Sequence, residues 1–305
     1  MKAKTILFGA GSAGEKFINN NDCNQYDLIA ISDNNPNIWG STLCEIPIIN
    51  PAEIAHHSFD QVIITSFWAD SIQDQLINEL NIPANKVIIA PKSTIKNAVT
   101  PFTDIPTLEL ARETMGVLSE YLISCNVNVY VDFGTLLGLI RDGDIIPWDD
   151  DIDFAVNEED FECVVKHMKS FAQLAPKAAG LEWQVSVISR ANNDTSIKIE
   201  FSQLQKKYND FKIGIAKRRH IDGNSVLVGL GGMLYAPSFH FKDHEIINVF
   251  GYNFKTPSKP KEYLSFVYGD WKTPVKGMTF QDYNNRNIPS EMDADTMYTT
   301  SKLIS

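Results

Sequence analysis

Four of the five residues from 149 to 153 are aspartates, and this acidic run lies inside an otherwise apolar stretch. The chain reads IIPW before the run and FAV after it. Two unit charges about 4 Å apart repel by roughly 4 kcal/mol at an effective dielectric constant of 20, so crowded carboxylates beside buried segments require a counter-ion. A solvated acidic loop is the usual explanation of a charge run, but the apolar flanks disfavour it here. We therefore expect these aspartates to bind a cation.

The segment DIDFAV alternates polar and apolar residues in the way typical of a β-strand. Asp151 and Asp153 then project from one face, with Ile152 on the other, and Asp149 extends the acidic face. A strand rises about 3.3 Å per residue, which places Asp151 and Asp153 roughly 6 to 7 Å apart. Oxygen-only ligands favour magnesium, calcium or manganese. A calcium-binding EF-hand loop is disfavoured because Phe154 stands where that loop needs glycine.

The first hundred residues indicate a Rossmann-like parallel sheet. An apolar run at 4–8 is followed by the glycine turn GAGSAG and a helix-like EKFINN. Three more β-branched runs, DLIAIS, QVIITS and KVIIA, alternate with helical segments. Continuous apolar strands of this kind are typical of a parallel sheet covered on both faces.

The glycine turn admits two interpretations. Gly9, Gly11 and Gly14 could let the backbone approach a pyrophosphate, while Asp33 could bind a ribose hydroxyl, so NAD or a nucleotide sugar is a candidate cofactor. The same glycines also suit plain packing of a strand against a helix, and both readings stay open. Residues 1 to 95 resemble the small nucleotide-binding-like domain found at the front of several bacterial polysaccharide-biosynthesis enzymes.

Prolines mark the division between two domains. A polar stretch between the two halves contains Pro91, Pro101 and Pro106. This favours a first domain at 1–98 and a second at 99–305. The second domain opens with a helical apolar stripe that we assign to core packing. The fold class is therefore α/β, with an N-terminal Rossmann-like domain followed by an α+β domain.

Composition excludes several functional classes. The formal net charge of -11 argues against a nucleic-acid binder, because phosphate contacts need a basic face. The four cysteines contain no CxxC pair, which disfavours a disulfide framework or a cysteine zinc site. The sequence shows no apolar run of transmembrane length and no signal-peptide pattern, so we expect a cytoplasmic protein.

Two separated motifs resemble those of a known family. GTLLGLIRDGDIIPWDDDIDFAV at 134–156 and PSKPKEYLSFVYGDWKTP at 257–274 are similar to signatures of the LicD/fukutin family. A glycine-threonine turn followed by paired aspartates on the next strand resembles the polymerase-beta-like nucleotidyltransferase fold. The resemblance spans about residues 107 to 275. It implies an enzyme that transfers a phospho-substituent from a CDP-linked donor, such as CDP-choline or a CDP-alditol, to a glycan hydroxyl in cell-surface polysaccharide or lipopolysaccharide biosynthesis.

The resemblance also implies roles for individual residues. The metal ligands would be Asp149, Asp151 and Asp153, holding Mg²⁺ or alternatively Mn²⁺, and the latter two aspartates would be catalytic. The remaining matches form a donor-binding set made of Gly134, Thr135 and Arg141. Arg141 could equally be an exposed arginine that forms a salt bridge.

The third carboxylate of such a fold has two candidates. Glu200 alternates with the apolar Ile199 and Phe201 on a later strand, and we favour it as a catalytic residue and general base. Asp222, in the stretch RRHIDG, is the rival. The nearby basic run from Lys217 to His220 could attract the diphosphate donor or could be a solvated strand end.

The alternative function is an NAD-dependent sugar-nucleotide oxidoreductase or epimerase that uses the first domain. YxxxK pairs, which suit such chemistry, occur at Tyr208/Lys212 and Tyr268/Lys272. Both pairs lie outside the Rossmann-like half, which disfavours this alternative. For the favoured function, a lipid-linked glycan acceptor would bring the protein to a membrane surface without a transmembrane segment.

Overall fold

The computed structural model describes residues 2–20, 25–66, 68–95, 99–177, 180–190, 193–230, 234–275, 283–286 and 299–305. The chain divides into two compact units, the first ending at residue 98 and the second beginning at Val99. The second unit also takes in the described residues 283–286 and 299–305. The boundary expected from the sequence lies between residues 98 and 99, and residues 96–98 lie outside the described residues.

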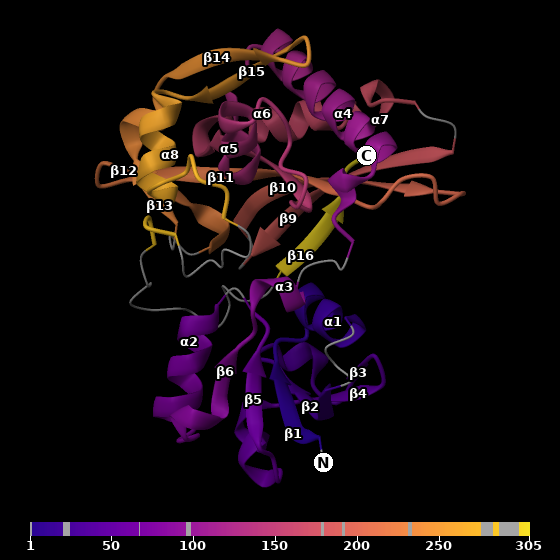
Figure 1. Ribbon diagram of the computed structural model, residues 1–305, viewed down its shortest axis with the longest axis vertical. Coiled ribbons are helices and arrows are strands. Elements are labelled where there is room, and N and C mark those ends of the chain that lie inside the picture. The colour runs from indigo at the N-terminus through magenta and orange to yellow at the C-terminus, as the bar shows by residue number, and fades with distance from the viewer. Residues whose placement is uncertain are drawn as a thin grey trace. The chain divides into compact units, whose positions relative to one another are not determined.

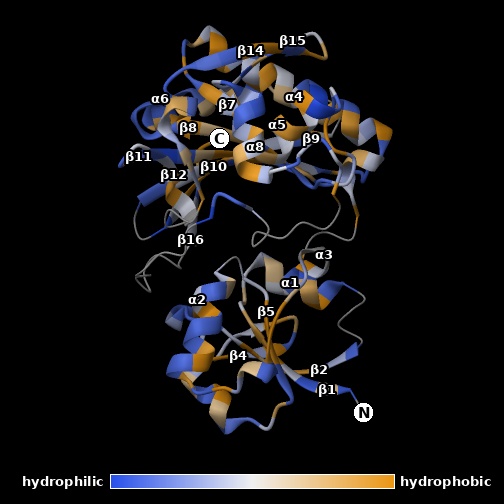
Figure 2. Ribbon diagram, turned by 60° about the vertical axis from the view of Figure 1, so that its left-hand side comes forward, coloured by the Kyte–Doolittle hydropathy of each residue, from blue (hydrophilic) through white to orange (hydrophobic). Residues whose placement is uncertain are grey.

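The first unit is built on a six-stranded sheet in the order β3-β4-β2-β1-β5-β6 (Figure 1). β1 pairs in parallel with β2 and β5, and the pairs β2–β4 and β5–β6 are parallel as well. The short strand β3 is antiparallel to β4. Hydrophobic colours concentrate on these strands, as a sheet covered on both faces requires (Figure 2). The predicted parallel sheet is thus confirmed. The bounds are β1 Ala3–Phe8, β2 Tyr26–Ser32, β3 Thr42–Leu43, β4 Ile46–Ile49, β5 Gln61–Ile64, β6 Val87–Ile89, α1 Ser12–Asn19, α2 Ala69–Asp74 and α3 Lys92–Ile95.

The glycine turn packs β1 tightly against the start of α1. A methyl group added at Gly14 would collide with the carbonyl oxygen of Gly9. The hydroxyl of Thr65 donates to the carbonyl oxygens of Phe8 and Gly9, at 3.2 and 3.1 Å. Gly14 is therefore required by the packing of the protein itself.

The second unit contains an eight-stranded mixed sheet. Its main path runs β13-β12-β11-β10-β9-β16. Two strands lie off this path: β8 pairs with β11, and β7 pairs with β8. The β8–β11 pair is parallel, and the neighbouring pairs are antiparallel. The bounds are β7 Val129–Val131, β8 Asp151–Asn157, β9 Leu181–Arg190, β10 Asn193–Gln203, β11 Lys212–Ile221, β12 Asn224–Leu227, β13 Tyr235–Pro237 and β16 Thr299–Leu303.

Helices and one hairpin complete the second unit (Figure 1). The longest helix, α4, is capped by Asp104, whose carboxylate accepts the backbone N–H of Thr107 at 3.0 Å. No helix within the described ranges is long and apolar enough to cross a membrane. The bounds are α4 Ile105–Ser124, α5 Phe133–Arg141, α6 Glu158–Met168, α7 Phe171–Leu174, α8 Pro260–Tyr268, β14 His244–Val249 and β15 Tyr252–Pro257.

The alternation predicted for β8 is confirmed. Ile152 and Phe154 are buried in the core, whereas Asp151 and Asp153 are partly buried on the opposite face. Residues opposite each other in a sheet project from the same face. The register pairs Asp151 with Lys212 and Asp153 with Gly214, so β11 continues the acidic face.

We predict that Gly14→Ala destabilises the first unit by about 1 to 3 kcal/mol, because the added methyl group must displace the Gly9 carbonyl. Gly11→Ala is the matched control, since a methyl group there has nothing within 4 Å. Its cost should stay below about 1 kcal/mol, the loss of a glycine N-cap. Urea unfolding of both variants measures the difference, and equal losses would contradict this account.

Candidate active site

The segment between α5 and β8 folds back along α5 and delivers the aspartates to the first turn of that helix. Gly134 and Gly138, one helical turn apart, face this segment. A methyl group at Gly138 would collide with the carbonyl oxygen of Asp144, and one at Gly134 would collide with the Asp149 carboxylate. The glycines of GTLLG thus make room for the chain itself. The positive end of the α5 dipole favours a carboxylate at this place.

Three consecutive aspartates form a compact group at the start of β8. One carboxylate oxygen from each of Asp149, Asp150 and Asp151 lies within 4.8 Å of the others, and all three side chains are partly buried. Oxygen ligands at this spacing fit a hard divalent cation such as Mg²⁺. Asp150 was not assigned as a ligand from the sequence, whereas Asp153, which was, is not one of these three.

Asp153 lies next to this group and is held by the backbone. Its N–H donates to the hydroxyl of Thr135 at 2.8 Å, and its carbonyl accepts the N–H of Asp132 at 3.0 Å. Burial raises the pKa of the Asp153 carboxyl well above its ordinary value, and the charges of Asp151, Asp149 and Asp132 raise it further. A cation beside this carboxyl would favour its ionised form.

Lys212 is the basic residue closest in register to the aspartates. Its ammonium lies 3.5 Å from a carboxylate oxygen of Asp151. Burial lowers the pKa of Lys212, but Asp151, Asp150 and Asp153 together outweigh it, so the net pKa is raised. Sequence reasoning missed this residue, because only the pairing of β8 with β11 brings it to the site.

The residues predicted to bind the donor occupy defined places around α5. Thr135 is buried, and its hydroxyl accepts the Asp153 N–H, while Gly134 faces Asp149. Arg141 lies at the other end of α5 and pairs with Asp142, its guanidinium nitrogen 2.7 Å from the carboxylate. A contact of these residues with a donor phosphate stays a prediction. In this structure Gly134 and Thr135 support the aspartate group, whereas the ion pair of Arg141 is with Asp142, outside that group.

A buried ion pair lies directly behind the aspartates. The guanidinium of Arg218 donates to one oxygen of Asp132 from two nitrogens, at 2.7 and 3.1 Å. Tyr263 donates its hydroxyl to the other oxygen at 2.5 Å. All three side chains are fully buried. Burial lowers the pKa of Arg218, but the Asp132 charge raises it more, and burial followed by Asp132 raises the pKa of Tyr263 well above its ordinary value.

The hydrogen bond of Tyr263 to this ion pair links the neighbourhoods of the two motifs singled out in the sequence. Tyr263 belongs to α8, within the second motif, whereas Asp132 lies two residues before the first. Tyr268, at the end of α8, has a pKa raised by burial first, then by neighbouring tyrosines and by Asp153. Trp271 is buried and donates its indole N–H to the Ser265 hydroxyl at 3.0 Å, which indicates a packing role. The two motifs therefore contribute to one site.

The two candidates for the third carboxylate lie in very different places. Glu200 lies on β10 and shares the sheet face of Asp151 and Lys212, since Lys198 pairs with Gly214 and Glu200 follows two residues later. Its carboxylate lies 2.6 Å from the ammonium of Lys198. Asp222 forms the tight turn between β11 and β12, at the opposite end of β11 from Lys212. Nine residues of strand separate it by roughly 30 Å from that end.

In the first unit, Asp33 is engaged by the backbone around the glycine turn. One carboxylate oxygen accepts the N–H of Ala10 at 2.7 Å, and the other accepts the N–H of Asn35 at 2.8 Å. Gly11, by contrast, has open space beside it. Binding of NAD or a nucleotide sugar through Gly9, Gly11, Gly14 and Asp33 stays a prediction.

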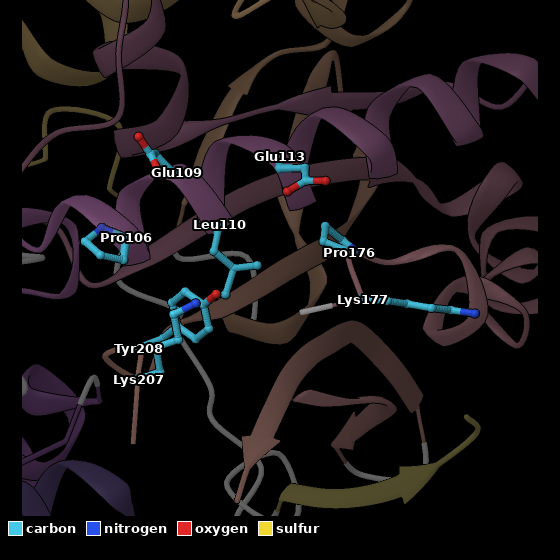
Figure 3. Close-up of a pocket in the computed structure, with 8 residues that line it drawn as sticks. All are labelled: Pro106, Glu109, Leu110, Glu113, Pro176, Lys177, Lys207 and Tyr208. Carbon is cyan, nitrogen blue, oxygen red and sulfur yellow. The ribbon is translucent and has the colours of Figure 1, made fainter. Parts of the chain in front are cut away.

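A cavity of about 420 Å³ lies elsewhere in the second unit, beside α4 (Figure 3). Leu110 and the ring of Tyr208 line it together with Glu113 and Lys207, and the lining includes none of the four aspartates. Gln203 holds the loop of Lys207 and Tyr208 that lines the cavity. The side-chain oxygen of Gln203 accepts the backbone N–H groups of these two residues at 2.9 and 3.0 Å. This cavity is distinct from the aspartate group.

Comparison with known proteins gives matches for both units. Residues 126–259 match the family model described as LicD/FKTN/FKRP, nucleotidyltransferase domain. This match supports membership of the LicD family. Residues 1–88 match the model described as C2185-like, N-terminal. The LicD segment contains the aspartates, Lys212 and Arg218, and it points to a transferase.

Individual relatives are distant. An uncharacterized protein of Rickettsia prowazekii (strain Madrid E) is 28% identical over 157 residues, which are 50% of this chain and 51% of that protein. The chain thus spans about half the length of this curated relative. UDP-D-quinovosamine 4-dehydrogenase from Vibrio fischeri is 23% identical with a TM-score of 0.23, covering 29% of this chain and 76% of its own. Scyllo-inositol dehydrogenase from Lactobacillus casei is 13% identical with a TM-score of 0.24, covering 84% and 82%. Likenesses this weak carry no functional argument.

We predict that Asp132→Ala and Arg218→Met each lower the free energy of unfolding by about 3 to 5 kcal/mol, because each leaves a buried charge without its partner. The double variant should lose less than the sum of the two, by about 0.5 to 3 kcal/mol. Tyr263→Phe, which removes one hydrogen bond to Asp132, should cost about 1 to 3 kcal/mol.

Denaturant titration measures these losses. The exposed Lys259–Glu262 pair serves as the control, since its removal should cost less than about 1 kcal/mol. Strict additivity of the Asp132 and Arg218 substitutions would show that the two side chains do not stabilise each other.

We also predict that Asp153→Asn stabilises the protein at neutral pH in EDTA. The folded-state pKa of Asp153 is raised, so the folded state binds more protons and stability is lost as pH rises from the ordinary value of 3.8 through the folded pKa. Removing the charge should therefore raise the Tm at pH 7, and this gain should disappear below pH 3.8. Asp222→Asn, at the exposed turn, is the control. A lower Tm for Asp153→Asn at pH 7 would refute the expected crowding.

Proposed function

We propose that this protein is a LicD-type phosphotransferase. It transfers a phosphocholine-type or alditol-phosphate-type group from a CDP-linked donor to a sugar hydroxyl. The observation that carries the proposal is the grouping of Asp149, Asp150 and Asp151 at the start of α5, inside the segment that matches the LicD model. Carboxylates are held together there although they repel, as a site for a cation and phosphates requires.

The aspartates would hold Mg²⁺, with Mn²⁺ as the alternative. Asp149 and Asp151 would be ligands, Asp150 would join them because its carboxylate lies in the same group, and Asp153, the next residue of β8 on the same face, would be a further ligand. The bound ion would neutralise charge on the donor diphosphate and on the departing CMP. The α5 first turn, with its backbone N–H groups and Gly134, supports the negative charge gathered at this end.

Glu200 is our candidate for the general base that accepts the proton of the acceptor hydroxyl. It projects from the same sheet face as Asp151, one strand beyond Lys212, and its pairing with Lys198 holds the carboxylate in place. Asp222 is disfavoured for this role because it lies at the far end of β11. The acceptor would then approach over the open face of β10 and β11.

The wider setting is also part of the proposal. A glycan acceptor places the reaction in cell-surface polysaccharide or lipopolysaccharide biosynthesis at the cytoplasmic face of a membrane. A lipid-linked acceptor would bring the protein there as a peripheral enzyme. The first unit could bind NAD or a nucleotide sugar, which would serve regulation or coupling to the sugar-nucleotide supply.

The decisive test is to incubate the protein and Mg²⁺ with a panel of CDP-linked donors and a glycan acceptor mixture, and to follow CMP release by mass spectrometry. We expect at least one donor to release CMP with the acceptor present. Asp151→Asn should reduce the rate by at least about a hundredfold, because the metal contributes several kcal/mol to such a transfer.

Two further variants sharpen this test. Glu200→Gln should slow transfer by about a hundredfold or more, as expected for loss of a general base, whereas Asp222→Asn should keep the rate of the parent. CMP release that is unaffected by Asp151→Asn would refute the assignment of the site.

A further inference from the structure

Lys212 is a basic side chain that an ion pair joins to the aspartate group. It is the first residue of β11, directly opposite Asp151, and its ammonium lies 3.5 Å from the carboxylate. The side chain is half exposed, at 51%. Exposed pairs of this kind contribute only about 0 to 1 kcal/mol. The contact is therefore weak enough for a stronger partner to replace it.

Open space lies beside Lys212 on the acidic face. Gly214, the next β11 residue on this face, stands opposite Asp153, and a methyl group added there would have nothing within 4 Å. A ligand oxygen could occupy this space next to both Lys212 and Asp153. The neighbouring lysine on the same face, Lys198, is bound more closely to Glu200, at 2.6 Å. Lys212 is thus the basic group best placed to turn toward a ligand.

The charges indicate what that ligand carries. Asp149, Asp150, Asp151 and Asp153 together bring four carboxylates, and one divalent ion neutralises half of that charge when all are ionised. A diphosphate adds further negative charge, and a mobile cation beside its oxygens would offset part of that charge. A lysine ammonium is a compact point charge on a flexible stem, and it binds phosphate in this way.

We propose that Lys212 alternates between two partners: it is the counter-ion of Asp151 in the metal-free protein, and it binds the donor's diphosphate once Asp151 holds the divalent ion. This inference rests on the proposed function for the identity of the donor. Lys212 then competes with the metal for Asp151 but cooperates with it in binding diphosphate. Removal of the ammonium must therefore change the two affinities in opposite directions.

The experiment measures two affinities of the full chain by isothermal titration calorimetry. The first is for Mn²⁺ without nucleotide, and the second is for CDP at saturating Mn²⁺. Lys212→Met should bind Mn²⁺ about 2- to 5-fold more tightly, the equivalent of a lost exposed ion pair, and CDP about 10-fold more weakly. Lys212→Arg should restore most of the CDP affinity. Lys259→Met, which breaks the exposed pair with Glu262, is the control and should change either affinity less than about twofold.

Opposite changes separate this role from a structural one, because a damaged site would bind both ligands more weakly. Weaker Mn²⁺ binding by Lys212→Met, unchanged CDP binding, or no Mn²⁺ binding by the parent at millimolar concentration would each overturn the proposal. Neither affinity requires turnover. If the two affinities change as expected and no CDP-linked donor releases CMP, the proposed transfer is wrong while the role of Lys212 stands.

Discussion

The buried contact between Asp132 and Arg218 is the interaction on which the site depends. Removing two charges from water costs several kcal/mol per ion, so the pair persists only because its hydrogen bonds are made. Asp132 accepts hydrogen bonds from Arg218, Tyr263 and the Phe133 N–H, and the guanidinium lies 4.2 Å from the Phe241 ring centre. These groups come from the end of β7, the middle of β11 and α8. Their convergence fixes where α5 begins, because that helix starts at the next residue.

The position of α5 in turn decides how closely the carboxylates can crowd. Its glycine face holds the returning segment, and Thr135 anchors the backbone of Asp153. The repulsion that results is visible in the raised pKa of Asp153, which burial causes first and the neighbouring aspartates increase. The ion pair and the core stabilise the fold. The carboxylates at the start of β8 can therefore stay close together although they repel, and a cation could reduce this repulsion.

Local patterns were enough to predict the parallel sheet of the first unit, the alternation in β8 and the similarity of the first motif to the LicD family. Contacts set by non-local pairing were not predictable. The basic run from Lys217 to His220 was interpreted as a donor attractant or a solvated strand end, yet Arg218 is fully buried against Asp132. Lys212 reaches the acidic face through the parallel β8–β11 register, which a single sequence does not specify. Glu200, which the order of the strands had favoured, shares that face through the pairing of β10 with β11. Asp150 was passed over because strict alternation places it on the opposite face, but it precedes the strand, which begins at Asp151.

The two glycine turns show why a glycine pattern alone does not identify a phosphate site. In the first unit Gly14 makes room for the carbonyl oxygen of Gly9, and in the second Gly134 makes room for the carboxylate of Asp149. In both turns the glycine accommodates an oxygen atom of the protein. The turns differ in their charge. The carboxylate of Asp33 accepts two backbone N–H groups, whereas Asp149 belongs to a group of neighbouring carboxylates, one of which, Asp151, pairs with the half-exposed Lys212. The grouping of mutually repelling carboxylates is therefore a better reason to propose a cation there than the glycines beside it.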